Sequence, residues 1–127
     1  MDKLYKRLRD VHEAGAYRLN CTLDDLRGAA HEAGFAFFEI DFSEVHSKGA
    51  LLAALAEAIG APEWFGNNWD ALADALGDLS WRPSSGYVLV LRDVSVDAAD
   101  EDMLNNILLE TVAYWEMQNK AFWAFYA

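Results

Sequence analysis

The chain has 127 residues, of which 54% are hydrophobic and 13% aromatic, so it can bury a core and does not have the composition of a disordered protein. Ten basic residues against 21 acidic ones give a net charge of −11. Residues 1–9 alone carry +3, which leaves −14 for residues 10–127. A surface this negative repels phosphate backbones and anionic lipid, so nucleic acid and membranes are poor direct partners and a basic protein is favoured.

Several patterns are missing from the sequence. There is no apolar run of the ~20 residues that cross a bilayer and no hydrophobic segment of a signal peptide. The single cysteine, Cys21, cannot form an internal disulfide, and His12, His31 and His46 lie far apart without the spacing of metal ligands. We therefore expect a cytoplasmic protein without metal or cofactor.

The N-terminal quarter is expected to form a helix, a short strand and a second helix. Residues 1–14 have the pattern of a charged helix, and residues 16–21 form a candidate strand. Thr22, with Asp25 three residues later, is placed to N-cap a helix that runs to about Ala33.

A strand and an amphipathic helix follow. The β-rich run over 35–42 predicts a strand. Ser47 is placed to cap a helix that ends near Gly60, because Pro62 prevents its continuation. Its apolar residues recur at helical spacing and form one stripe, made of Leu51, Leu52, Leu55 and Ile59.

The second half continues the alternation. Asn67 or Asn68 caps a helix to about Gly77, and residues 87–91 read as a strand buried on both faces. A long helix is expected to begin at Asp100 and to be C-capped by Asn119, before a last strand over 121–126. The residues that recur at helical spacing along it are Leu104, Ile107, Leu108, Thr111 and Trp115. Strands that alternate with helices predict an α/β layer structure with a mainly parallel sheet of three to four strands.

The helix after Asn68 carries the most specific pattern. On a helical wheel of residues 68–79, an apolar stripe of Trp69, Leu72, Ala73 and Leu76 lies opposite a row of Asp70, Asp74 and Asp78. The preceding loop places Trp64 and Phe65 beside this acidic row. Aromatic residues next to a charged row are typical of a protein-binding surface, although such a row is also found on purely solvated faces.

Residues 62–76, PEWFGNNWDALADAL, resemble without gaps the signature of the barstar family of intracellular ribonuclease inhibitors. The resemblance implies a small barstar-like layer structure, with an inhibitor domain over 34–127 and an N-terminal extension over 1–33. It also implies a non-enzymatic immunity protein that occludes the active site of a basic, secreted-type ribonuclease in a 1:1 complex.

The same resemblance implies roles for individual residues. Asp74 matches the central aspartate that occupies the phosphate site of the nuclease, and Asp70 matches the second acidic contact. Trp64 matches the aromatic that packs on the nuclease, Asn68 matches the loop amide, and Phe65 is expected to face inward. The full predicted partner-binding set is Trp64, Phe65, Asn67, Asn68, Asp70, Ala71, Asp74 and Asp78.

The sequence also departs from the family pattern. Ala73 replaces a tryptophan of the best-known member, and Asp78 and Leu79 replace a Gly–Trp pair. No glutamate stands at the corresponding positions of the last helix, near Thr111, Tyr114 and Gln118. These departures leave the target nuclease open.

Two other functions remain from the residues alone. The acidic face could serve an adaptor that binds a different basic protein. Asp70 and Asp74 could also form the acid–base pair of a small hydrolase, although neighbours on an exposed helix lack the desolvation that separates two carboxylate pKa values.

Overall fold

The computed structural model describes residues 2–62 and 66–127, apart from the side chain of Asp2. The described residues form five helices and four strands. In chain order these are α1 (Asp2–Leu8), β1 (Ala16–Arg18), α2 (Leu23–Ala33), β2 (Ala36–Asp41), α3 (Lys48–Ile59), α4 (Trp69–Leu76), β3 (Gly86–Arg92), α5 (Ala98–Met117) and β4 (Ala121–Tyr126).

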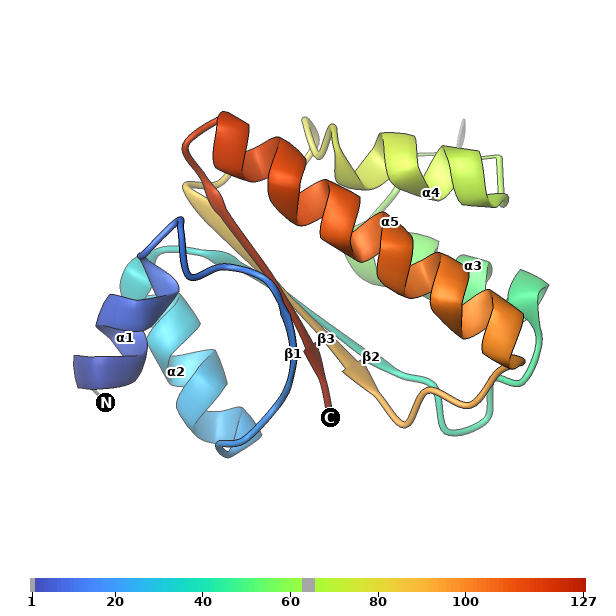
Figure 1. Ribbon diagram of the computed structural model, residues 1–127, viewed down its shortest axis with the longest axis horizontal. Helices are drawn as coiled ribbons and strands as arrows, with labels where there is room; N and C mark the ends of the chain where they lie inside the picture. Colours follow the sequence, from blue (N-terminus) through green and yellow to red (C-terminus); the bar gives the residue numbers. More distant parts are fainter. Residues whose placement is uncertain (1, 63–65) are drawn as a thin grey trace.

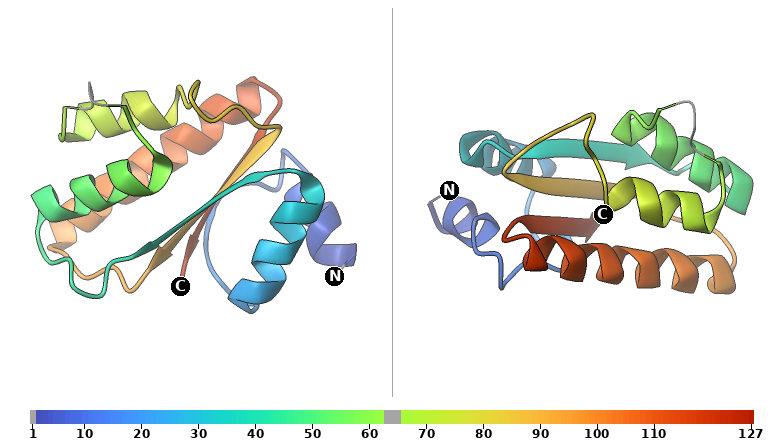
Figure 2. Two further views of the ribbon diagram at one scale, coloured as in Figure 1. Left: turned by 180° about the vertical axis from the view of Figure 1, so that it is seen from behind. Right: turned by 90° about the horizontal axis from the view of Figure 1, so that it is seen from above.

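The strands form one sheet in the order β1-β4-β3-β2, and every pairing is parallel. Figure 1 shows the sheet between two helical layers, with α1 and α2 on one face and α3, α4 and α5 on the other. The views in Figure 2 show the same arrangement from behind and from above. The predicted α/β architecture with a parallel sheet is therefore confirmed.

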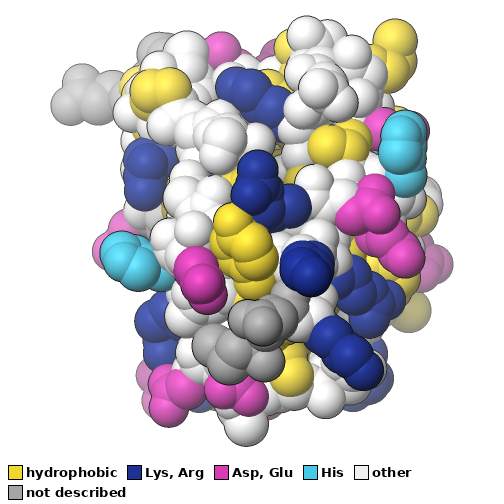
Figure 3. Space-filling view, turned by 90° about the vertical axis from the view of Figure 1, so that its left-hand side faces the viewer, with side chains coloured by type: hydrophobic (Ala, Val, Ile, Leu, Met, Phe, Trp, Pro, Cys, Tyr) yellow, Lys and Arg dark blue, Asp and Glu magenta, His cyan; other side chains and the backbone are white. Residues whose placement is uncertain are grey.

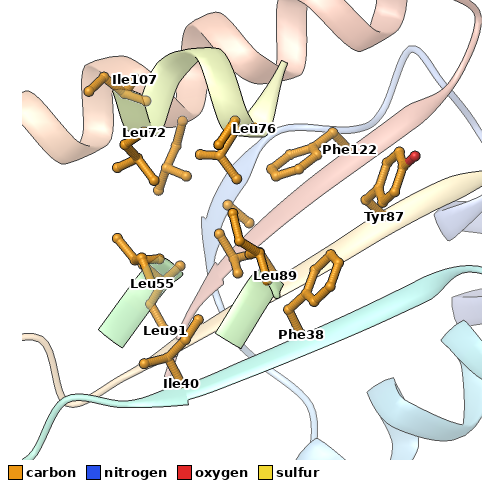
Figure 4. Packing of buried hydrophobic residues seen from close by; sticks show 14 of the residues in the cluster. Phe38, Ile40, Leu55, Leu72, Leu76, Tyr87, Leu89, Leu91, Ile107 and Phe122 are labelled. Carbon is orange, nitrogen blue, oxygen red and sulfur yellow. The ribbon is translucent and has the colours of Figure 1, made fainter. Parts of the chain in front are cut away.

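The larger core lies between the sheet and α3, α4 and α5. In Figure 4, Leu72 and Leu76 of α4 point toward Leu55, Leu89 and the other side chains that line this space. The helix α4 contacts both α3 and α5, so it rests on these two helices as well as on the core. This packing sets which side of α4 remains in contact with solvent.

The smaller core lies between the sheet and α1 and α2. Trp123 of β4 is central to it, since its side chain is buried and its Nε1–H donates to the Leu8 carbonyl at 2.8 Å. The rings of Trp123 and Phe125 are stacked, with centroids 5.6 Å apart. Residues 1–33 thus contribute a strand to the sheet and two helices to one of its faces.

Most helix ends lie where the sequence predicts them. The side chains of Thr22 and Ser47 accept hydrogen bonds from backbone N–H groups at 3.0 and 3.2 Å and so N-cap α2 and α3. Gly34 and Gly60 terminate these helices with φ of 75° and 70°, a left-handed conformation that glycine adopts without steric cost.

Four predicted boundaries are wrong. The first helix ends at Leu8 instead of continuing to residue 14, because the Asp10 side chain accepts from the His12 N–H and replaces a helical bond with a turn. The first strand ends at Arg18 instead of residue 21, since its partner β4 ends there too, with Arg18 opposite Tyr126. The last helix begins at Ala98 instead of Asp100, and its C-cap is Gln118 instead of Asn119, which follows in the left-handed region with a φ of 60°.

Candidate protein-binding site

The turn before α4 is built by two asparagines with different roles. Asn67 has a φ of 48°, in the left-handed region. Asn68 is the N-cap, because its Oδ1 accepts from the Ala71 N–H at 2.8 Å while its Nδ2 donates to the Gly66 carbonyl at 3.2 Å. The sequence left the choice between the two residues open, and the structure assigns the cap to Asn68.

The apolar side of α4 attaches the helix to the core. Leu72, Ala75 and Leu76 are fully buried, whereas Trp69 and Ala73, which the sequence placed in the core stripe, are only half-buried. At the helix end, the Leu76 carbonyl accepts from Trp115 Nε1–H of α5 at 2.8 Å. This buried bond joins α4 to α5, so both helices hold a defined position.

The opposite side of α4 presents Asp70 and Asp74 to solvent. Within residues 2–62 and 66–127, neither carboxylate takes part in an ion pair or a side-chain hydrogen bond. Asp70 lies in the first turn, where the helix dipole stabilises a negative charge, and Asp74 lies in the last turn, where the dipole opposes it. Two exposed charges on a firmly attached helix are therefore available to a partner.

The predicted row of three aspartates on one helix is wrong at its third member. The helix α4 ends at Leu76, and Asp78 lies in the turn that follows, where it accepts from the Ser80 hydroxyl at 3.2 Å. Leu79 then takes a φ of 49° and is buried. Asp78 thus belongs to the turn after the helix, and the acidic row on α4 itself consists of Asp70 and Asp74.

A groove runs between α4 and α5, and we call it the α4–α5 groove. One part, of about 330 Å³, is lined by Ala73, Asp74, Gly77, Ile107, Glu110, Thr111 and Tyr114. The adjoining part, of about 540 Å³, is lined by Lys48, Asn68, Trp69, Asp70, Ala73, Met103, Asn106, Ile107 and Glu110. Glu110 lines both parts, so it shares the groove with both aspartates of α4.

Sequence reasoning missed Glu110. The signal was present, because Ile107, Glu110 and Tyr114 follow one another at spacings of three and four residues and therefore share a face of α5. That face could not be assigned to the site from the sequence, since the pattern does not say which helix lies beside α4.

Of the remaining predicted residues, Ala71 is half-buried, and Trp64 and Phe65 lie outside the described residues.

Charge is distributed unevenly over the molecule. Figure 3 shows Lys and Arg side chains gathered over the side formed by α1 and α2, among scattered acidic ones. This side includes Lys3, Lys6 and Arg7 of α1. Because the aspartates of α4 lie across the sheet, a cationic partner is attracted to the α4 side and repelled by α1.

The described residues include no group of three or more His, Cys, Asp or Glu side chains that could hold a metal ion. Within the same part of the chain, no helix is both long and apolar enough to cross a membrane. His12 and His46 lie apart, the first near Glu116 and the second near the Ser95 carbonyl.

The geometry is that of a small α/β protein that presents an acidic helix on its surface. A family model described as Barstar (barnase inhibitor) matches residues 35–127, a range that includes β2 and every later element. The chain belongs to the barstar family. Residues 1–34 lie outside the matched range. A search of curated proteins gives no match to the chain.

Proposed function

We propose that this protein is an intracellular inhibitor of a basic ribonuclease and that α4 and the loop before it occlude the active site of the nuclease. In this mechanism the carboxylates of Asp70 and Asp74 take the places of RNA phosphates in a cationic cleft. Trp64 and its loop seal the rim of that cleft. The inhibitor performs no chemistry itself, and one molecule blocks one nuclease.

The observation that carries this proposal is the state of the two aspartates. Both are exposed and, in the described part of the chain, neither takes part in an ion pair that would have to be broken. Because no intramolecular ion pair has to be broken, the pairing of these charges with the nuclease is offset only by their desolvation.

The attachment of α4 adds to this advantage. The Asn68 cap orders its first turn, and the bond from Trp115 to the Leu76 carbonyl holds its last turn. A surface already held in its bound conformation loses less conformational entropy on association, which increases affinity. Membership of the barstar family supports the same assignment.

A titration of ribonuclease activity tests the proposal. A nuclease of the barnase class is held at a fixed concentration, and we expect its activity to fall linearly to zero at one equivalent of this protein. Asp70→Asn and Asp74→Asn should each raise the dissociation constant. Asp25→Asn is a matched control, since it removes the same charge from α2 on the other face of the sheet. Full activity at a large excess of folded wild-type protein contradicts the proposal and favours an adaptor for another basic protein.

Salt dependence tests the electrostatic part of the mechanism. Attraction between a protein of charge −11 and a cationic cleft should raise the association rate above the unsteered ~10⁵–10⁶ M⁻¹s⁻¹ at low salt. The rate should fall as the Debye length shrinks from about 10 Å at 0.1 M to about 3 Å at 1 M. Neutralising Asp100, Glu101 and Asp102 together should slow association only. A faster dissociation of that variant would show that the start of α5 touches the nuclease.

A further inference from the structure

Beside Asp74 the α4–α5 groove is open because Ala73 of α4 and Gly77, the C-cap residue after this helix, are small. Ala73 lines both parts of the groove, and Gly77 lines the part that contains Asp74. The Ala73 side chain is half-buried and packs against the larger core. A longer side chain at this position would occupy the space between the two helices.

The floor of the groove is formed by α5 and has no unsatisfied polar group among the described side chains. Ile107 and Thr111 are 6% and 4% exposed. The Thr111 hydroxyl donates to the Ile107 carbonyl at 2.8 Å, so its proton is already bonded within the helix. Such a floor suits the methylene groups of a long side chain rather than a polar ligand.

The walls supply charge and an aromatic ring. Asp74 rises from α4 and Glu110 from α5, and in the described structure neither carboxylate is paired with a cation. Tyr114 is 44% exposed and is held edge-on against Trp115, with ring centroids 5.1 Å apart. The part of the groove beside Asp74 therefore offers an apolar floor, an acidic group on each helix and an accessible aromatic side chain, and Lys48 lines only the adjoining part.

We infer that Ala73 is a specificity-determining residue, because it keeps the groove open for a long basic side chain that the nuclease inserts between α4 and α5. This inference rests on the proposed function. The stem of that side chain lies on Ile107 and Thr111, and its head lies between Asp74 and Glu110. Arginine fits better than lysine, since its planar guanidinium pairs with two carboxylates and also stacks on an aromatic ring.

The groove can be tested without the nuclease. The folded protein is titrated with N-acetyl-arginine methylamide, and backbone amide shifts are followed by NMR. We expect saturable shifts in residues that line the groove, at millimolar concentration. Ala73→Leu should abolish saturation, and Ala53→Leu, the same change at an exposed position of α3, should not. Saturable binding that persists in Ala73→Leu, or shifts that rise linearly at every acidic residue, would overturn the inference.

A second variant covers the case in which Ala73→Leu does not fold. Glu110→Gln keeps the size of an exposed side chain and removes the charge of one wall. It should weaken arginine binding severalfold while leaving the melting temperature unchanged. Unaltered arginine affinity in folded Glu110→Gln would contradict the proposed position of the guanidinium.

The complex with the nuclease separates this inference from the proposed function. Ala73→Leu should raise the dissociation constant at least tenfold, whereas Ala53→Leu should leave it within a factor of two. If Ala73→Leu binds like wild type while Asp74→Asn is weakened, the groove receives no side chain and the inhibitor function stands. If wild-type protein does not inhibit the nuclease, the proposed function fails. The arginine titration then shows by itself whether the groove binds a long basic side chain.

Discussion

Asp74→Ala should separate stability from binding more clearly than any other substitution in this protein. The carboxylate is exposed, and among the described residues it has no ion-pair partner whose loss would destabilise the fold. It lies four residues after Asp70 and in the last turn of α4. The repulsion from Asp70 and the position in the last turn both destabilise the free protein, so removing the charge of Asp74 should stabilise it.

The magnitude follows from three contributions. Repulsion between like charges at i and i+4 costs about 0.2–0.5 kcal/mol. A negative charge in the last turn of a helix costs about 0.3–1 kcal/mol against the dipole, and alanine improves helix propensity by up to about 0.7 kcal/mol. Because the position is exposed and the contributions overlap, we expect a gain of about 1 kcal/mol, which corresponds to roughly 3–5 °C in melting temperature for a domain of this size.

Thermal melts followed by circular dichroism measure this gain, and 1 M salt should reduce its charge-dependent part. Asp78→Ala is the matched control, since Asp78 lies beyond α4 and makes no pair within the helix. In the nuclease complex, the same Asp74→Ala should lose more than about 2 kcal/mol, or roughly 30-fold in affinity. A variant that melts several degrees lower and still binds normally would refute this reasoning.

Three further outcomes are expected. Trp115→Phe removes a buried hydrogen bond to the Leu76 carbonyl and leaves a cavity, which should lower the free energy of unfolding by about 2 kcal/mol in urea titrations. Burial, and secondarily the charge of Asp25, raises the pKa of the Cys21 thiol, so iodoacetamide at pH 8 should alkylate it more slowly in folded than in urea-unfolded protein. Burial raises the pKa of Tyr126 to about 12, so its stabilising contribution is complete below pH 10 and is lost as the pH rises toward 12. Tyr126→Phe should reduce this loss, and an unchanged slope of stability against pH would contradict it.

The local structure around the site could be predicted from the sequence because it depends on neighbouring residues. The amide of Asn68 caps α4 through a bond to a residue three positions away. The alternation that turns Leu72 inward and Asp70 outward follows from the 3.6-residue period of a helix. The apolar run over 87–91 indicates a central parallel strand, and β3 is indeed buried along almost its entire length.

The sequence also determined the family through the uninterrupted pattern over 62–76, and the family model over 35–127 confirms this assignment. The sequence determined the ends of some helices and strands less well. The first helix and the first strand end early for reasons that depend on the Asp10 turn and on the length of β4.

Only the tertiary structure decided what lies across from the aspartates. Glu110 and Tyr114 are 36 and 40 residues after Asp74 along the chain, yet they line the same groove. Trp115 likewise bonds to the Leu76 carbonyl across a separation of 39 residues. A helical pattern specifies which side of a helix is buried but not which helix will pack beside it. That choice depends on how the whole core closes around the sheet, and so the position of Glu110 beside the two aspartates became visible only when α4 and α5 were seen together.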